Sequence, residues 1–265
     1  MPLLDHQIVL GRCLQASGAD ALTADTVQGL GIDREELARL RDLVQCSGFR
    51  FTQRVQRSWC IVRAAGAVQL TLSLFPIEQR RRLVEDWVDR GGGRALDVAS
   101  EAAELLEFVA RHLTNPSHAL AVCRMEQAAY RASEAAVRFR RPDLSLLDHP
   151  NAVLRVGKGA ALVRFLVEPQ RLFDAIAAKE PLPPLSDRPF PVLFAPGLPK
   201  LYRAASNEEV AIWEKLARPI AVRLLTPDRH QRHVIEQFFN IGAADLVPEG
   251  GLPVSDMRSA TSARE

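Results

Sequence analysis

The spacing of apolar residues changes part-way along this chain of 265 residues. Up to about residue 148, apolar residues recur three and four positions apart, the period of an amphipathic helix. After His149-Pro150 they come in short alternating runs, as at 161–167, which is typical of strands. From Pro248 onward Gly, Pro, Ser and Arg dominate. The sequence therefore predicts an α+β protein with an all-helical domain at 1–148, a smaller α+β domain at 149–247 and a disordered tail at 248–265.

Start signals divide the first half into helices. Asp33, with Glu36 three positions later, forms a capping box. Pro76 suits a first helical turn, and Asp97 and Ser117 are further N-cap candidates. The expected helices cover residues 32–44, 49–75, 76–90, 97–113 and 117–141.

The second of these helices has one distinctive pattern. Phe51, Val55, Trp59 and Val62 share a single helical stripe. The end of the segment, residues 71–74, fits extended structure as well as helix.

Turn signals predict two hairpins in the second half. Two β-rich runs flank the Gly-Lys-Gly turn at 157–159. Two more, at 192–195 and 200–204, flank Pro196-Gly197.

Helices are expected between and after these hairpins. One covers 168–178, and a capping box of Ser206 and Glu209 starts the next. Another runs from Thr226-Pro227 to Gly242. The five prolines of 180–191 predict an extended connector.

Composition narrows the functional classes. Lys and Arg number 34 against 32 Asp and Glu, a net charge of +2, so no overall field favours nucleic acid or an anionic membrane. Arginine clusters at 80–82 and 138–141 are typical of solvated helix faces. No apolar run approaches the roughly 18 residues of a bilayer span. The four cysteines lack CxxC spacing and the start lacks a signal-peptide pattern, so we expect a cytoplasmic protein with reduced thiols.

Candidate catalytic groups are few. His230 and His233 lie three apart on a predicted helix, but two ligands do not make a metal site. Cys60 and Cys123 are either buried small hydrophobes or reactive thiolates. No catalytic or nucleotide-binding motif stands out. We therefore expect no catalytic residue, no metal site and no cofactor in this chain.

The helix at 117–141 carries polar groups that cannot all face water. Glu126 and Tyr130 lie at i,i+4 spacing, beside Arg124 and Arg131. They form either an internal polar network or a contact surface for a partner protein.

The second hairpin and its helix also have two readings. They form either an ordinary α+β core or an open sheet edge that a peptide extends by strand addition. Because proline has no N–H, Pro189, Pro191, Pro196 and Pro199 would guard part of that edge. Residues 200–204 would then be the docking strand.

Four stretches, residues 51–76, 87–93, 118–135 and 192–216, together resemble a family of partner proteins. These proteins accompany multinuclear non-haem iron oxidases in ribosomal-peptide natural-product biosynthesis, and the methanobactin-pathway partner is a relative. The resemblance spans roughly residues 45–247 and contains no single diagnostic motif.

The resemblance implies a division of labour. A separate oxidase chain holds the iron and oxidises a cysteine of a precursor peptide. The partner binds that oxidase and holds the peptide leader in a winged-helix-like recognition element. On this chain the implied leader site comprises Lys200, Leu201, Tyr202, Arg203, Ala204 and Trp213. The oxidase contact comprises Arg124, Glu126, Tyr130 and Arg131.

Two other classes of function stay open at this point. One is a DNA-binding regulator with a winged helix, which the near-neutral charge supports poorly. The other is a free-standing enzyme that uses Cys60 or Cys123.

Overall fold

The computed structural model describes residues 3–15, 27–28, 30–95, 97–149, 152–222 and 228–248. It divides into two compact units, unit 1 at Met1–His112 and unit 2 at Leu113–Glu265. The division falls earlier than the expected boundary at 148, because the long helix α8 (His118–Arg138) packs on strands of unit 2. The expected disordered tail lies almost wholly outside the described residues. No described helix is long and apolar enough to cross a bilayer.

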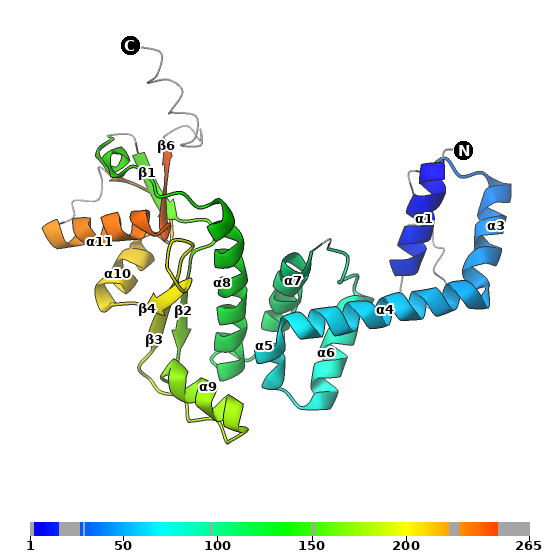
Figure 1. Ribbon diagram of the computed structural model, residues 1–265, viewed down its shortest axis with the longest axis horizontal. Coiled ribbons are helices and arrows are strands. Elements are labelled where there is room, and N and C mark those ends of the chain that lie inside the picture. Colours follow the sequence, from blue (N-terminus) through cyan, green and yellow to red (C-terminus); the bar gives the residue numbers. More distant parts are fainter. Residues whose placement is uncertain are drawn as a thin grey trace, which may run out of the picture. The chain divides into compact units, whose positions relative to one another are not determined.

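Unit 1 is helical throughout its described part (Figure 1). Its longest helix, α4, contacts α1, α3, α6 and α7. A small core of Val9, Cys13, Leu40 and Val44 joins its first helices. The helices are α1 (Leu3–Gln15), α3 (Arg34–Gln45), α4 (Ser47–Ala67), α5 (Gln69–Ser73), α6 (Ile77–Asp89) and α7 (Val98–Arg111).

The predicted helix starts are confirmed. Asp33 and Glu36 form the capping box of α3. Pro76 precedes α6, and the side chains of Asp97 and Ser117 accept hydrogen bonds from the first turns of α7 and α8. The ambiguous end of the second predicted helix is itself helical, as α5.

The described part of unit 2 contains two three-stranded antiparallel sheets, in the orders β5-β1-β6 and β2-β3-β4. Its strands are β1 (Ala152–Val156), β2 (Ala161–Phe165), β3 (Phe190–Phe194), β4 (Tyr202–Ala204), β5 (Ile220–Ala221) and β6 (Ala244–Pro248). Its remaining helices are η1 (Leu144–Asp148), α9 (Pro169–Ala178), α10 (Asn207–Lys215) and α11 (Arg229–Asn240). The sequence signals located neither β5 nor β6.

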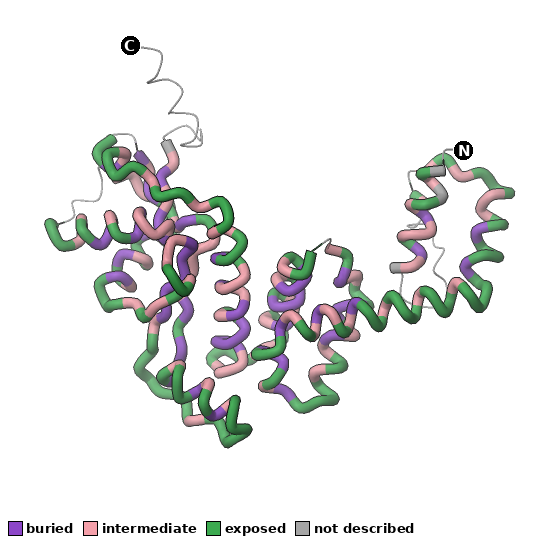
Figure 2. The backbone as a smooth tube through the Cα atoms, viewed as in Figure 1, coloured by how far each residue is buried: buried purple, intermediate pink, exposed green. Residues whose placement is uncertain are grey.

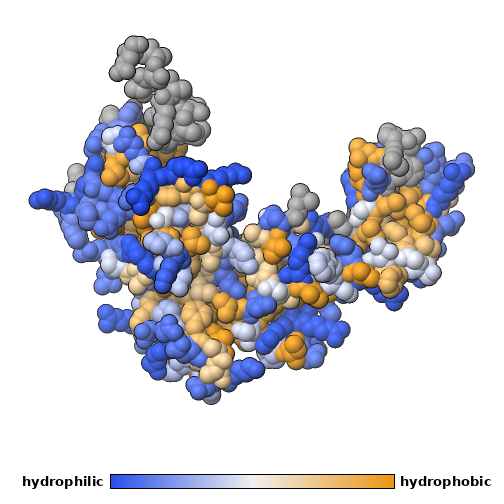
Figure 3. All heavy atoms as spheres, in the orientation of Figure 1, coloured by the Kyte–Doolittle hydropathy of each residue, from blue (hydrophilic) through white to orange (hydrophobic). Residues whose placement is uncertain are grey.

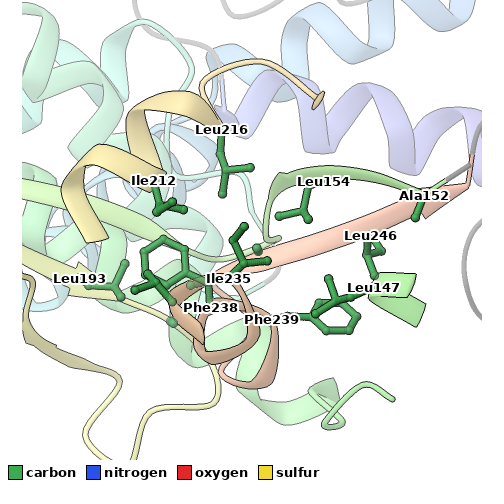
Figure 4. Close-up of a cluster of buried hydrophobic side chains, with 14 residues drawn as sticks. Leu147, Ala152, Leu154, Leu193, Ile212, Leu216, Ile235, Phe238, Phe239 and Leu246 are labelled. Carbon is green, nitrogen blue, oxygen red and sulfur yellow. The ribbon is translucent and has the colours of Figure 1, made fainter. Parts of the chain in front are cut away.

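The two sheets share one apolar core with α10 and α11. Leu154 of β1 and Leu193 of β3 are both fully buried there with Phe238 of α11. Figure 4 shows these side chains converging between the two helices and the strands. The core fixes the position of β3, and through β3 that of β4.

The predicted hairpin at 157–159 is wrong, because β1 and β2 belong to different sheets. The backbone N–H of Gly157 donates to Ala243 O at 2.9 Å, so the chain turns against the start of β6. A Cβ on Gly157 would lie 2.1 Å from Gly242 O. Gly159 adopts a positive φ of 82° and packs on α8, where a Cβ would lie 2.5 Å from that of Ala135. These contacts carry the chain from one sheet to the other.

The predicted hairpin around Pro196-Gly197 is confirmed, as β3 and β4. Its second strand begins later than expected, since Leu201 has a positive φ of 64° and closes the turn. Ser206 and Glu209 form the capping box of α10. Asp228 caps α11, whereas the expected start at Thr226-Pro227 lies outside the described residues.

Candidate peptide-binding edge

Strand β4 is the last strand of its sheet. Ala195 N–H donates to Leu201 O at 3.0 Å, and Ala205 N–H donates to Pro191 O at 2.9 Å. In an antiparallel pair the bonded and non-bonded residues alternate, so Arg203 also faces β3. The N–H and C=O groups of Tyr202 and Ala204 therefore point away from the sheet. No described strand pairs with that side.

One of these outward groups is already occupied. The guanidinium Nη1 of Arg203 donates to Ala204 O at 3.0 Å. The backbone N–H and C=O of Tyr202 and the N–H of Ala204 remain for an added strand. A peptide that adds as a further strand can form hydrogen bonds with these three backbone groups.

An ion pair fixes β4 against the start of α10. Arg203 binds Glu209 through both terminal nitrogens, one of them at 2.7 Å, and Glu209 is only 4% exposed. Burial alone would raise the pKa of the Glu209 carboxyl, but hydrogen bonds from Arg203 and the Ser206 backbone outweigh it and lower the pKa. Glu209 is therefore an ionised group inside the unit, and it holds the edge strand in place.

A groove of about 510 Å³ lies along one face of this edge. The β4–α10 segment and α11 form its two walls. Its lining residues are Arg203, Ser206, Glu208, Glu209, His230, His233, Val234, Gln237, Asn240 and Ile241. Because Arg203 is the middle residue of β4, the groove borders the face of this strand that carries the Arg203 side chain.

His230 bridges the walls of this groove. Its Nε2 lies 2.6 Å from Glu208 Oε2, and this hydrogen bond and the carboxylate charge raise the pKa of His230. The Nε2 of His233 instead lies 2.8 Å from Gln237 Nε2, so the two histidines have different hydrogen-bond partners. Within the described part of the chain, no three His, Cys, Asp or Glu residues form a metal-binding group.

The opposite face of the edge is apolar. Tyr202 is 54% exposed, and its ring centroid lies 5.6 Å from that of Phe194. By strand alternation Phe190 and Ala204 lie on this face as well. Phe190 also lines a hollow of about 300 Å³ with Leu185 and Val167. A peptide on β4 would thus have apolar contacts on one side and polar contacts on the other.

The structure brings together only part of the predicted leader site. Tyr202, Arg203 and Ala204 form the edge strand, while Lys200 and Leu201 belong to the turn before it. Trp213 packs edge-on against Phe238, with ring centroids 6.4 Å apart, and does not line the groove. The groove residues of α11 were missed, because helical spacing alone does not say which side faces a neighbouring strand.

The four prolines do not guard the open edge. Pro191 lies inside the central strand β3, where its missing N–H faces β4. Pro189 belongs to the connector before β3, and Pro196 and Pro199 to the turn after it.

The predicted partner-contact residues lie along α8, but they differ in exposure. Arg124 and Arg131 are exposed, Tyr130 is half-buried and Glu126 is buried. Burial, and after it the charge of Glu126, raises the pKa of Tyr130. Glu126 and Tyr130 therefore interact with each other, while the arginines face solvent.

The two candidate thiols are both buried. Burial, and after it the charge of Glu101, raises the pKa of Cys60. A raised pKa is the opposite of what a reactive thiolate requires. Cys60 accordingly behaves as a small packing residue.

Comparison with known proteins does not assign a family. The sequence matches no family model and no curated protein.

Proposed function

We propose that this chain is a non-catalytic partner subunit that holds the leader of a precursor peptide. A separate multinuclear non-haem iron oxidase would modify a cysteine of the same peptide. The observation that carries the proposal is the open edge of β4, with a polar groove on one face and an apolar strip on the other. In this proposal β2, β3 and β4 with α10 and α11 act as a winged-helix-like recognition element.

Strand addition accounts for leader affinity. The peptide backbone would bond to the N–H and C=O of Tyr202 and to the N–H of Ala204. Each such bond contributes about 0.5–1.5 kcal/mol net, so three bonds alone bind weakly and side-chain contacts must add to them. The rigid pairing of Arg203 with Glu209 limits the ordering cost, because the edge is already in place.

The two faces predict what the leader looks like. Side chains of a strand alternate between faces, so every second leader residue would enter the groove of Glu208, His230 and Gln237. The others would lie over Tyr202 and Phe190. We expect a leader in which polar or charged residues alternate with apolar ones.

The chain would act on the chemistry by positioning. Holding the leader keeps the reactive cysteine at high effective concentration near the oxidase. The exposed arginines Arg124 and Arg131 of α8 would contact the oxidase, with Tyr130 and Glu126 supporting them. The iron belongs to the oxidase chain in this proposal.

A binding titration tests the proposal. The full chain is titrated with the fluorescein-labelled leader of the precursor encoded beside its gene, and anisotropy is measured. Ala204→Pro removes an outward N–H without touching the bonds to β3, so affinity should fall about tenfold or more. Ala204→Val keeps the N–H and should bind normally. Equal affinity of both variants and the parent would refute the docking strand.

Salt dependence separates this proposal from a DNA-binding regulator. Binding to phosphate becomes much weaker as the salt concentration rises, whereas strand addition responds little. Duplex DNA that binds more tightly than the leader, with steep salt dependence, would favour the regulator.

A further inference from the structure

Helix α4 turns four large apolar side chains toward solvent. Phe51, Val55, Trp59 and Val62 are 63, 51, 58 and 67% exposed. They follow one another at intervals of four, four and three residues, so they lie on one face of the helix. We call these four residues the α4 stripe. In Figure 2 the N-terminal part of α4 is drawn largely in the colour of exposed residues.

The buried residues of the same helix are small. Cys60 is 6% exposed and Ala64 is fully buried. A Cβ on Gly93 would come within 3.0 Å of the Cys60 Cβ, so this side has no space for a larger side chain. Phe49 and Ile61 of α4 are partly buried, but the other large apolar residues of the helix are exposed while its buried residues are small. Figure 3 shows apolar side chains in orange on the surface of the unit that contains α4.

Such a surface requires an explanation. Soluble proteins scatter exposed apolar residues singly and seldom align large ones, and aligned residues mark interaction sites. Aromatic residues such as Phe51 and Trp59 are also the ones that dominate protein–protein interfaces.

The charges of α4 indicate the chemistry of the occupant. The helix has four arginines and no acidic residue. Arg57 is paired with Asp89, and Arg63 with Glu101. Arg54 follows Phe51 by three residues, so it is exposed beside the stripe, and it forms no ion pair with any residue that the structure describes. The border of the stripe is therefore positive.

We propose that the α4 stripe is the docking surface for an amphipathic helix of a partner protein. The apolar residues of that helix cover the stripe, and an aspartate or glutamate at its border pairs with Arg54. A second copy of α4 fits poorly, since it would bring only arginines to the contact. An anionic bilayer fits less well than an acidic helix, because one unpaired arginine beside the stripe supplies little of the basic charge that membrane-bound helices use. The inference is independent of the β4 edge.

Two synthetic helical peptides serve as probes. They share one leucine stripe and differ only in its borders, which are glutamate in one and lysine in the other. Titrated into the full chain, the glutamate peptide should bind about tenfold more tightly than the lysine peptide. Binding should also shift the emission of Trp59 to shorter wavelength, since Trp59 leaves water while Trp87 is already buried.

Variants locate the binding. The double variant, Val55→Ser with Val62→Ser, should lower the affinity for the glutamate peptide about tenfold. Arg54→Glu should make the affinities for the glutamate and lysine peptides equal. Ile77→Ser and Arg41→Glu are matched controls at exposed positions off the stripe and should change nothing. Because all these positions are exposed, circular dichroism should show the same helix content in every variant.

Other outcomes would overturn the proposal. Sedimentation could show that the chain forms dimers and that the double variant, Val55→Ser with Val62→Ser, does not. That result would assign the stripe to a second copy of the chain. Binding to phosphatidylglycerol vesicles in place of the peptides would assign it to a membrane. Acrylamide that fails to quench Trp59 in the free chain would show that the chain itself covers the stripe. Equal affinity for the glutamate and lysine peptides would contradict the proposal that the partner helix is acidic at its borders.

Discussion

Arg203, in the middle of β4, and Glu209, in the first turn of α10, form a two-point ion pair. Glu209 also accepts a hydrogen bond from the Ser206 N–H at 2.8 Å. One carboxylate thus fixes the exposed strand and caps the following helix. The stability of unit 2 and the shape of its peptide edge therefore depend on the same group.

Glu209→Gln should destabilise unit 2 by about 1–3 kcal/mol, because it leaves the Arg203 charge without its partner. The loss should be smaller than for a fully buried ion pair, because Arg203 is partly exposed to water. Urea unfolding measures the change. The matched control is Glu214→Gln, whose pair with Arg164 is exposed on both sides and should contribute less than about 0.5 kcal/mol. Similar losses for both variants would contradict the role of Glu209.

The same carboxylate predicts a pH dependence on the acid side. Its folded pKa is lowered from the ordinary value of 4.5. The stabilisation is therefore fully present above 4.5 and is lost as the pH falls through the folded pKa. In Glu209→Gln the stability of unit 2 should therefore fall less than in the parent as the pH is lowered below 4.5. An unchanged slope would refute the assignment.

His230 predicts a pH dependence of opposite sign. Its folded pKa is raised above 6.5 by Glu208. The contribution is therefore fully present below 6.5 and is lost as the pH rises through the folded pKa. An NMR titration should place the pKa of His230 above 6.5, and Glu208→Gln should lower it. If the pKa of His230 stays the same in Glu208→Gln, the hydrogen bond between His230 and Glu208 across the groove would be contradicted.

Local signals in the sequence predicted the helices well. The capping residues Asp33, Asp97, Ser117 and Ser206 act within one turn of their own position, so the sequence nearby contains the whole interaction.

Strand pairing was harder to predict, because partners are distant in the chain. Val153 of β1 pairs with Val247 of β6, not with the β2 run that follows it. The alternating pattern identified strands but could not choose between these partners. The β3–β4 pair was predictable because one short turn joins it.

The site was predictable only along β4. Tyr202, Arg203 and Ala204 followed from the hairpin, whereas His230 and Gln237 reach the groove through the packing of α11. Trp213 was expected to form a pocket wall beside this strand, but it is partly buried and packs against the core, edge-on to Phe238. Residue type did not distinguish a groove wall from a core residue.

The turn between the two sheets provides a packing prediction. Gly157→Ala should cost about 1–3 kcal/mol, because the new methyl group meets the Gly242 carbonyl. Gly66→Ala is the control, since a Cβ there meets nothing within 4 Å and the position is inside α4. It should stabilise the chain by about 0.5–1 kcal/mol. Urea unfolding measures both, and a neutral Gly157→Ala would contradict the close approach.

Thiol reactivity should follow burial. Cys46 is exposed, while Cys13, Cys60 and Cys123 are buried. Brief treatment of the folded chain with iodoacetamide should therefore alkylate Cys46 alone, and treatment in urea should alkylate all four. Mass spectrometry of the digested chain distinguishes the sites. Fast alkylation of Cys60 in the folded chain would instead support the hypothesis of an enzyme that uses this thiol.

The most direct test of strand addition uses the leader backbone itself. Two leader peptides are N-methylated at alternate residues, one series at odd positions and the other at even positions, and each is titrated into the full chain. Only the series whose N–H groups face β4 should lose affinity, because the other N–H groups point to solvent. Equal affinity of both series and the unmethylated leader would show that the leader does not extend β4.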